Sequence, residues 1–262
     1  MLSTTDLPDS TSPLGAACAQ SRPHRPEDAH SWSILHAQCR TRLLFNGCPQ
    51  YVEGYYALGL DSGRIESVGT LSRRLADLTG WTLLPVDGLL PHREFALALR
   101  DRRFPASWQL RPPHSLHFSA TPDFFHDIMG HLPLLTHPAY SAFLSAYADV
   151  ACEHLSSPQA CELLERIYWY TFETGLVRER ERHHVLGAAI VTSQSEWLHV
   201  NNPSTPHLEF DLDRVMDLPI DYSQVQAHYF VLPSFESLRS LASDLPTLLH
   251  RRTARRPQMP TP

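Results

Sequence analysis

The sequence predicts a mainly α-helical fold with a few short β-strands, on three observations. Several long stretches repeat apolar residues at the three- and four-residue spacing of an amphipathic helix. Only a few short stretches have the β-branched and aromatic runs that are typical of strands. The chain has 262 residues, of which 42% are hydrophobic, and this size and composition allow a substantial core.

Helices are expected where the apolar repeat is sustained. In the first of them Trp32, Leu35, Cys39 and Leu43 recur at helical spacing. The predicted helices cover residues 30–45, 68–81, 92–104, 140–155 and 159–177.

Local residues indicate where some of these helices begin and end. Thr70 is the expected N-cap of the second helix and Gly80 its expected end. Gly175 is expected to close the last one.

The best strand candidates are residues 186–197 and 227–235, which read "LGAAIVTSQSEW" and "AHYFVLPSF". Residues 80–91, "GWTLLPVDGLLP", are expected to be short, extended and rich in turns. No internal repeat is visible in the sequence.

The composition divides the chain into three parts. Residues 1–26 are rich in Ser, Thr, Pro and Asp and are expected to be disordered. Residues 27–250 are expected to form one domain. Residues 251–262 are expected to be a frayed, basic, proline-containing tail.

Charge and composition also bound the partners and the compartment. A net charge of −6 without a basic stripe argues against a nucleic-acid binder. No apolar run approaches the roughly 20 residues that span a membrane, and the N-terminus lacks the features of a signal peptide. Five cysteines without a Cys-x-x-Cys pair argue against a disulfide framework or a zinc ribbon. A cytoplasmic protein is the expectation.

The motif "HDIMGH" places His126 and His131 five residues apart. On an ideal α-helix this spacing corresponds to about 140° of rotation and roughly 7.5 Å of rise, so both rings reach one metal ion only if the helix loosens or ends between them. Gly130 and Pro133 favour such an end. We therefore expect His126 on a helix and His131 at or just past its end. The alternative is two ordinary histidines in a half-buried segment.

A third ligand candidate is Glu173, which lies in the most aromatic stretch of the chain, "IYWYTFETG". Burial of an unpaired carboxylate costs several kcal/mol, and a cation removes this cost. Two histidines and one carboxylate form the facial triad of non-haem Fe(II) sites, which leaves coordination positions open. The alternative for Glu173 by itself is an ion-paired helix residue.

Two other metal-enzyme classes are less consistent with the sequence. The 2-oxoglutarate oxygenases use His-x-Asp/Glu and a distant histidine on a strand-built barrel, for which "HLE" at 207–209 with His228 is the one match. Too few strands are predicted for such a barrel. An unrelated metallohydrolase needs a general base beside the metal, and only Asp127 is a candidate.

The motifs together resemble the pterin-dependent aromatic amino acid hydroxylases, most closely the short bacterial phenylalanine 4-monooxygenases. The resemblance rests on "PDFFHDIMGHLPLL" followed by "IYWYTFETGL", and extends over about residues 31 to 240. Further ordered matches are "TGWTLLPVDGLLP", "RRFPASWQLRPP", "GAAIVTSQSE" and "YFVLPSFE". It implies the fold of that family's catalytic domain for residues 27–250.

The resemblance also implies roles for individual residues. His126, His131 and Glu173 are the implied iron ligands. The implied pterin-binding residues are Phe95, which stacks on the ring, Leu90 in the "GLLP" segment, and Asp127. The implied substrate-binding residues are Arg111, which holds the carboxylate, Ser119, Trp169, Thr192 and Ser193, with Asp123 as a supporting acid.

The implied reaction is the hydroxylation of a free aromatic L-amino acid, phenylalanine to tyrosine, with Fe(II), a tetrahydropterin and O₂. The same chemistry on tryptophan or at the 3-position of phenylalanine, and a non-catalytic iron- or pterin-binding relative, remain alternatives. The chain departs from the family pattern near the amino acid pocket, at Phe118, Ser119, Thr121, Ala189 and Thr192. A monomer is expected, since the sequence shows no sustained heptads.

Overall fold

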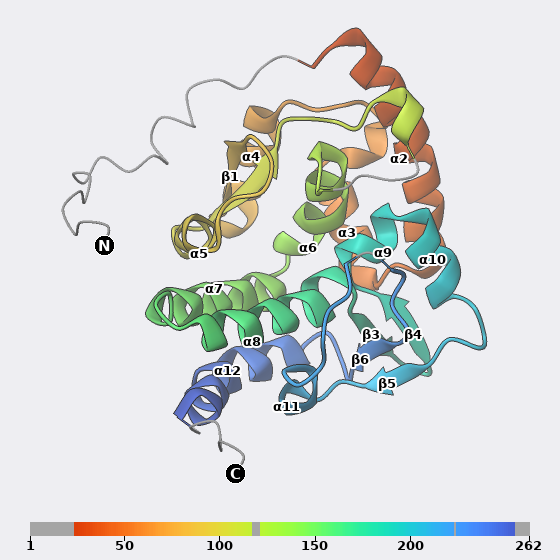
Figure 1. The fold of residues 1–262 in the computed structure, drawn as a ribbon. Coiled ribbons are helices and arrows are strands. Elements are labelled where there is room, and N and C mark those ends of the chain that lie inside the picture. The colour runs from red at the N-terminus through yellow and green to blue at the C-terminus, as the bar shows by residue number, and fades with distance from the viewer. Residues whose placement is uncertain (1–23, 117–120, 223, 255–262) are drawn as a thin grey trace, which may run out of the picture.

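The computed structural model describes residues 24–116, 121–222 and 224–254 (Figure 1). Most of the described chain is helical, as the apolar spacing predicts. The α-helices are α2 (Pro26–Asn46), α3 (Pro49–Ala57), α4 (Val68–Thr79), α5 (His92–Arg100), α6 (Leu132–Leu135), α7 (Pro138–Glu153), α8 (Pro158–Tyr168), α9 (Ala188–Thr192), α10 (Gln194–Val200), α11 (Leu212–Val215) and α12 (Ser237–Ala254). The short turns are the 3₁₀ helices η1 (Leu60–Ser62) and η2 (Pro113–Ser115) and the π-helices η3 (His126–His131) and η4 (Trp169–Glu173).

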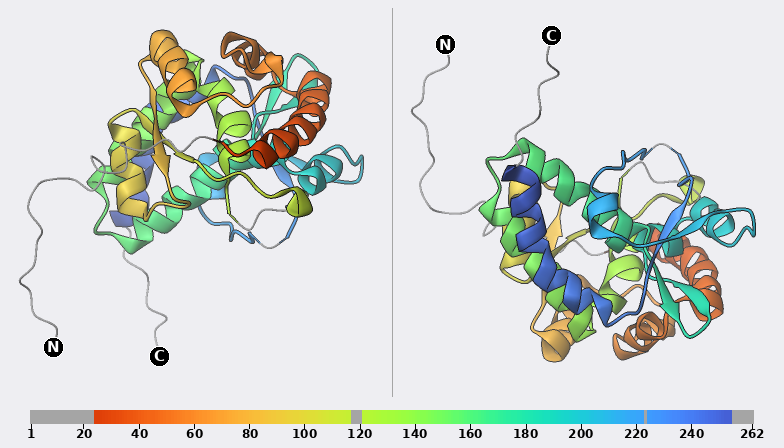
Figure 2. Two further views of the ribbon diagram at one scale, coloured as in Figure 1. Left: turned by 90° about the horizontal axis from the view of Figure 1, so that it is seen from above. Right: turned by 90° about the horizontal axis from the view of Figure 1, so that it is seen from below.

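The strands form two small sheets. β1 (Thr82–Val86) and β2 (Arg103–Ser107) pair in parallel and are connected through α5. The other sheet has the order β4-β3-β6-β5 and consists of β3 (Leu176–Glu179), β4 (Arg182–Val185), β5 (His207–Glu209) and β6 (Tyr229–Leu232). Figures 1 and 2 show the β1–β2 pair with α4 and α5 at one end of the molecule, and the four-stranded sheet at another, with helices between them.

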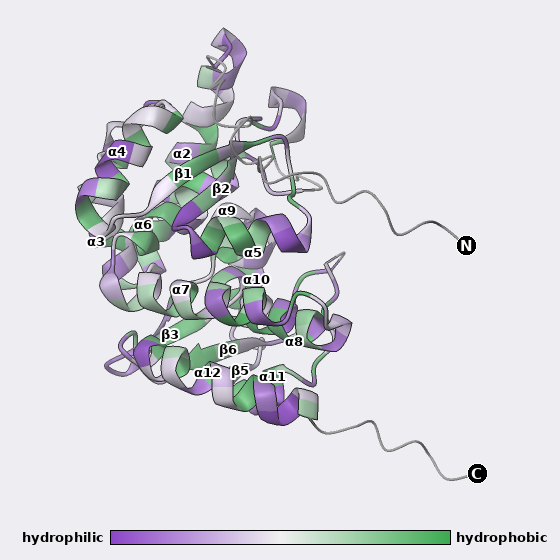
Figure 3. Ribbon diagram, turned by 90° about the vertical axis from the view of Figure 1, so that its left-hand side faces the viewer, coloured by the Kyte–Doolittle hydropathy of each residue, from purple (hydrophilic) through white to green (hydrophobic). Residues whose placement is uncertain are grey.

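One continuous cluster of buried apolar side chains extends from α2 to α12. Its largest members include Trp32, Trp81, Tyr51, Phe143 and Phe230, which are all almost fully buried. The outer helices are amphipathic, and Figure 3 shows hydrophilic and hydrophobic residues on different sides of α4 and α12. Burial of these apolar faces is the main source of stability of such a fold.

Most of the predicted helices are confirmed, with small shifts at their ends. Helix α4 begins one residue after Ser67, whose side chain accepts a hydrogen bond from the backbone N–H of Thr70, so Ser67 and not Thr70 is the N-cap. Gly80 ends this helix with a positive φ of 74°, which glycine adopts without steric cost. Strand β6 lies within the predicted segment 227–235.

One segment prediction is wrong, and one predicted helix ends earlier than expected. Residues 186–197 are not a strand but contain α9 and the start of α10. The run "AAIVT" is buried almost throughout, and periodicity cannot distinguish a fully buried helix from a buried strand. The predicted helix 92–104 ends at Arg100, and a turn through Arg102, which has a positive φ of 54°, leads into β2.

The ends of the chain are ordered further than predicted. Helix α2 begins at Pro26, inside the segment expected to be disordered. Helix α12 continues to Ala254, four residues into the expected frayed tail, and Arg251 and Arg252 form ion pairs with Asp213. Residues 1–23 and 255–262 lie outside the described part of the chain. No helix in the described part is both long enough and apolar enough to cross a bilayer.

The turn that carries the two histidines differs from the prediction. His131 was expected at or past a helix end, but it is the last residue of η3, and the chain continues directly into α6. The i→i+5 hydrogen bonding of a π-helix brings residues five apart close to one face, which an α-helix does not. Pro133 is accommodated because it stands in the first turn of α6, where its missing N–H is not needed.

Tyr51 on α3 stabilises this turn by hydrogen bonding. Its buried hydroxyl donates to the carbonyl oxygens of Met129 and Gly130, the latter at 2.8 Å. These carbonyls belong to η3, where the wider winding disturbs the regular helical hydrogen bonds. Tyr51 therefore satisfies buried acceptors next to His131.

We expect Tyr51→Phe to destabilise the protein by about 1–3 kcal/mol, because buried carbonyls lose their donor. Tyr56→Phe is the matched control, since Tyr56 is on the same helix and exposed, and we expect a change within about 0.5 kcal/mol. Urea denaturation measures both. Equal losses in the two variants would contradict a supporting role for Tyr51.

Candidate metal and substrate site

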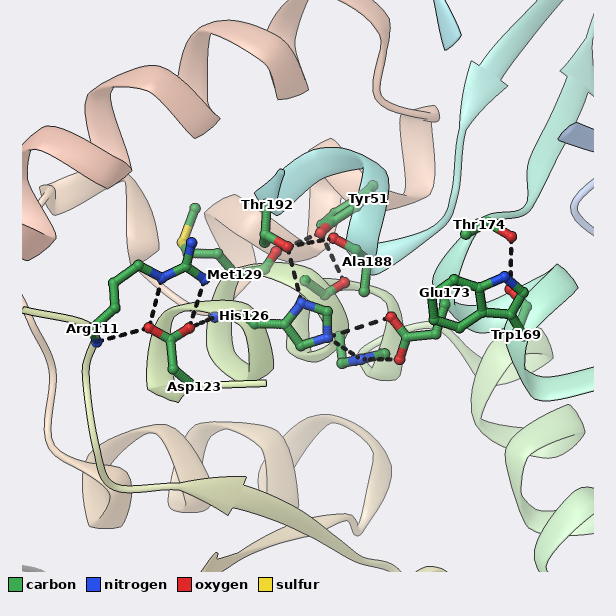
Figure 4. Close-up of polar contacts among 12 residues, drawn as sticks. Tyr51, Arg111, Asp123, His126, Met129, Trp169, Glu173, Thr174, Ala188 and Thr192 are labelled. Carbon is green, nitrogen blue, oxygen red and sulfur yellow. Dashed lines mark hydrogen bonds and ion pairs between the residues drawn. The ribbon is translucent and has the colours of Figure 1, made fainter. Parts of the chain in front are cut away.

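Three buried side chains, His126, His131 and Glu173, converge at the centre of the molecule (Figure 4). The two Nε2 atoms lie 3.2 Å apart. Glu173 places Oε2 3.4 Å from Nε2 of His126 and Oε1 3.1 Å from Nε2 of His131. Within the described residues this is the one group of three or more potential metal ligands whose ligand atoms lie this close together.

These distances fit a metal ion. Two ligands at right angles, each about 2.1 Å from an ion, lie about 3.0 Å from each other. The three measured separations are all close to this value. Two imidazole nitrogens and one carboxylate on one face of an ion form the donor set typical of non-haem Fe(II).

The orientation of His126 is fixed by Thr192 on α9. The Thr192 hydroxyl donates to the carbonyl oxygen of Ala188 at 2.7 Å, so its proton is already used. Its Oγ1 lies 2.9 Å from Nδ1 of His126 and must therefore accept a hydrogen bond from Nδ1–H. This leaves the lone pair of neutral His126 on Nε2, which faces Glu173. A metal-binding histidine is commonly oriented by such an outer partner.

Two glycines allow α9 to approach both ligand-bearing turns. A Cβ on Gly130 in η3 would lie 2.8 Å from Cβ of Ala188. A Cβ on Gly187, directly before α9, would lie 2.3 Å from the backbone oxygen of Glu173. Larger side chains at these positions would push α9 away from the site. Gly130 is therefore needed so that α9 can pack closely against η3. It does not end a helix, contrary to the expectation from the sequence.

The pKa values of His126, His131 and Glu173 depend on one another. Burial acts to raise the pKa of Glu173, but the imidazoles of His131 and His126 outweigh it and hold this pKa below its ordinary value. Burial lowers the pKa of His131 and so favours the neutral ring that binds metals. Nδ1 of His131 has no hydrogen-bond partner among the described residues.

Arg111 and Asp123 form a buried, two-pronged ion pair beside the histidines. Nε and NH2 of Arg111 each lie 2.8 Å from one carboxylate oxygen of Asp123. Asp123 also accepts the backbone N–H of Arg111 and that of His126. Burial acts to raise the pKa of Asp123, but the hydrogen bonds and charge of Arg111 hold it below its ordinary value.

The residues that the resemblance assigns to the pterin lie around the β1–β2 end of the site. Phe95 on α5 is half-buried and its ring stands edge-on to Tyr168, with 5.6 Å between the ring centroids. Asp127 is buried, accepts the backbone N–H of Ser107 at 2.7 Å, and burial raises its pKa to about 7. Leu90 packs against the small cluster of Leu84, Val86 and Ala98.

Trp169, at the start of η4, is held by residues that the sequence did not single out. Its indole N–H donates to Oε1 of Gln226 at 2.9 Å. The backbone N–H of Gln226 donates to Glu196, whose carboxylate also accepts from the hydroxyl of Tyr229. Ser193 caps α10 by accepting the N–H of Glu196. The sequence signal for this network is the position of Glu196 inside one predicted strand segment and of Gln226 directly before the other, because a polar residue buried there needs a partner.

Not every predicted site residue can be placed. Ser119 and Phe118 lie outside the described residues.

Arg42 on α2 was not predicted as a site residue, but it lies next to the site. It is half-buried and donates a hydrogen bond to the carbonyl oxygen of Val191, the residue before Thr192. Burial and the charge of Arg111 both lower the pKa of Arg42.

The sequence model of the biopterin-dependent aromatic amino acid hydroxylases matches residues 23–254. The chain belongs to this family. The match includes all three potential metal ligands and the Arg111–Asp123 pair. It makes the chain an aromatic amino acid monooxygenase that depends on iron and a biopterin.

Named relatives and solved structures agree with the family. The phenylalanine-4-hydroxylase of Chromobacterium violaceum is 35% identical over 213 residues, 81% of this chain and 71% of that protein. The phenylalanine-4-hydroxylase of Pseudomonas aeruginosa is 32% identical over 229 residues, 87% of each chain. The structure of the Chromobacterium violaceum enzyme with iron(III) and 7,8-dihydrobiopterin matches with a TM-score of 0.84 at 31% identity, over 97% of this chain and 95% of that one. Its iron- and phenylalanine-bound structure matches with a TM-score of 0.82 at 31% identity, over 95% of each chain.

We expect Thr192→Val to weaken iron binding by roughly 10- to 100-fold, because loss of an outer partner of a metal-binding histidine has an effect of this size. Valine keeps the shape and removes the acceptor for Nδ1–H of His126. Thr192→Ser keeps the hydroxyl and should bind iron nearly as the wild type does. The measurement is competition with an iron chelator. Equal affinities of the Val and Ser variants would show that the hydrogen bond has no part in holding the metal.

Proposed function

We propose that this enzyme hydroxylates free L-phenylalanine to L-tyrosine, with Fe(II) held by His126, His131 and Glu173 and with a tetrahydropterin as cosubstrate. The single observation that carries the proposal is the convergence of these three donors, 3.1–3.4 Å apart, in a fold of the biopterin-dependent hydroxylases. The substrate is inferred from the named relatives, which are phenylalanine-4-hydroxylases.

The protein's own contribution is to position the reactants and to exclude water. When bound, the iron activates O₂ and the tetrahydropterin supplies two electrons that protein side chains cannot. The ligand side chains are buried, and aromatic rings surround them: Phe104 and Tyr168 lie 5.1 and 6.2 Å from the ring of His131. Such a wall presents a substrate ring, rather than solvent, to the metal.

Arg111 is proposed to bind the α-carboxylate of the substrate. A guanidinium has five N–H groups. Asp123 accepts two of them and the carbonyl oxygen of Leu116 accepts a third at 3.4 Å. The two that remain belong to NH1 and NH2 and can meet a carboxylate side by side. Asp123 thus orients Arg111 and offsets its positive charge, but it leaves N–H groups of the guanidinium free to bind the substrate.

Trp169 is proposed to line the pocket for the aromatic ring of the substrate, and Ser119, Thr192 and Ser193 to stand at its polar end. The indole of Trp169 is fixed on one side by Gln226 and on another by Tyr222, whose ring stands edge-on with 4.8 Å between the centroids. Fixed aromatic walls reduce the ordering cost of substrate binding. Phe95, Leu90 and Asp127 are proposed to form the pterin side of the site.

A single catalytic domain over residues 27–250, acting as a monomer in the cytoplasm without a nucleic-acid partner, completes the proposal. Leu238, Leu245 and Leu249 of α12 are buried by the chain itself, and this helix packs chiefly against α7. These three leucines are therefore not available for assembly with a second chain. A light-scattering mass of one 29.7 kDa chain would support the monomer, and twice that mass would overturn it.

The activity is tested by loading the protein with Fe(II) anaerobically, and then adding tetrahydropterin, air and one aromatic amino acid at a time. We expect tyrosine from phenylalanine, identified by mass and retention time. Glu173→Ala and His126→Ala should lose bound iron and product together, because each removes one of three metal ligands. Wild-type iron content in both variants would refute the ligand assignment. Iron binding without oxidation of the pterin would instead indicate a non-catalytic relative.

We expect Arg111→Lys to raise the Michaelis constant for phenylalanine by about tenfold or more, about 1.4 kcal/mol, because lysine cannot form two parallel bonds to a carboxylate. Pterin oxidation should become partly uncoupled from hydroxylation, since a loosely held ring is misplaced. Iron content should stay full.

Arg214→Lys is the matched control for this variant, because Arg214 also stands 5.7 Å over an aromatic ring but is exposed and outside the site. Steady-state kinetics, with product and consumed pterin counted in the same samples, give the comparison. If Arg111→Lys kept the normal Michaelis constant for phenylalanine and full coupling of pterin oxidation to hydroxylation, the substrate carboxylate would have to bind to another residue.

Phe95→Ala should raise the Michaelis constant for the pterin by roughly two- to thirteenfold, because a stacked aromatic contributes about 0.5–1.5 kcal/mol beyond its buried area. The affinity for iron should not change. An unaltered pterin constant would assign Phe95 to packing against Tyr168 alone.

A further inference from the structure

A second group of potential metal ligands lies on the four-stranded sheet, outside the iron site. His183 on β4 and His207 on β5 place their Nδ1 atoms 3.0 Å apart. Their rings are 5.3 Å apart at an interplanar angle of 39°. Both side chains are half-exposed, so that ions in solution can reach them.

The protonation of this pair follows from its neighbours. Nε2 of His207 lies 2.9 Å from the carbonyl oxygen of Val200, which can only accept, so Nε2 carries the proton. In the neutral ring the lone pair is then on Nδ1, where it accepts the Nδ1–H of His183 in the metal-free protein, and a bound metal ion would displace this proton. An imidazole whose other N–H donates to a backbone carbonyl has the arrangement that is usual for a metal-binding histidine.

We propose that His183 and His207 bind a divalent late transition metal ion, Zn²⁺ or Cu²⁺, through their Nδ1 atoms, with water in the remaining positions. The 3.0 Å separation equals the distance of about 3.0 Å between two ligands at right angles, each about 2.1 Å from one ion. It is also close to the 3.2 Å between the two histidines of the iron site. Imidazole ligands without thiolates favour zinc, copper and nickel.

The charges around the pair are compatible with a cation. Arg178 on β3 is opposite His183 in the β3–β4 register, and it forms an ion pair with Glu209 on β5, so its charge is offset. Glu209 is two residues from His207 and therefore on the same face of β5. Burial, His207 and Arg178 lower the pKa of His183, against a raising effect of Glu209, and so favour its neutral, metal-binding form.

A metal ion at this site would connect the β3–β4 hairpin to β5, which is the opposite edge of the same sheet. His183 belongs to the hairpin of β3 and β4, and His207 to β5, which pairs with β6 and not with this hairpin. The Arg178–Glu209 ion pair already links the same two parts. Binding to the folded state alone would stabilise it by mass action. The proposal does not depend on the hydroxylase function.

The test is calorimetric titration of the iron-loaded enzyme with Zn²⁺ at neutral pH, with the iron content measured before and after. We expect one Zn²⁺ per chain to bind without loss of iron and to raise the melting temperature. His183→Gln and His207→Gln should each lower the zinc affinity by more than the roughly tenfold that loss of an outer partner causes. Glutamine is chosen because it retains hydrogen-bonding capacity, which limits any effect on folding.

His184→Gln is the control, because His184 follows His183 on β4 and points to the opposite face of the sheet. It should bind zinc as the wild type does. Unchanged affinity in both pair variants, zinc uptake only in exchange for iron, or no zinc binding by the wild type would each overturn the proposal. Unfolded pair variants would be replaced by His183→Asn and His207→Asn, judged by the same criteria.

Discussion

The site depends on one departure from α-helical geometry, the π-helical turn η3. An α-helix would rotate His131 far from His126, whereas i→i+5 bonding brings them to one face, with 3.2 Å between their Nε2 atoms. Glu173 ends a second π-helical turn, η4, where the N–H of Thr174 donates to the carbonyl of Trp169 five residues earlier. All three donors thus come from π-helical turns, and their close approach without a cation would place lone pairs and a carboxylate against one another.

The surrounding elements hold these turns in place. Tyr51 supplies a donor to the carbonyls of η3, and α9 lies against η3 and near Glu173 because Gly130 and Gly187 have no side chain. This close packing brings Thr192 on α9 next to His126, where its hydroxyl fixes the tautomer and the direction of the imidazole ring. The arrangement of the three candidate ligands therefore depends as much on tight backbone contacts as on the ligand side chains themselves.

A single carboxylate couples the metal side to the proposed substrate side. Asp123 accepts a hydrogen bond from the backbone N–H of His126 at the start of η3. Its carboxylate also accepts two hydrogen bonds from Nε and NH2 of Arg111. Both charges are buried, and each is compensated by the other. Asp123 thus connects the arginine directly to the first residue of the histidine-bearing turn. On the other side of the site, Glu196 and Gln226 play a comparable part for Trp169.

Sequence by itself predicted the mainly helical fold class, the helices α2, α4, α5, α7 and α8 apart from their ends, and His126, His131 and Glu173 as candidate metal ligands, because apolar spacing and ligand type are local properties. It could not determine that residues 188–192 are helical, since a buried apolar run suits a helix or a strand, nor that η3 is a π-helix. The partners of these residues, Tyr51, Ala188 and Gln226, come from distant parts of the chain. Only the tertiary structure decided them, because a hydrogen bond or a close backbone contact exists only once the chain has folded.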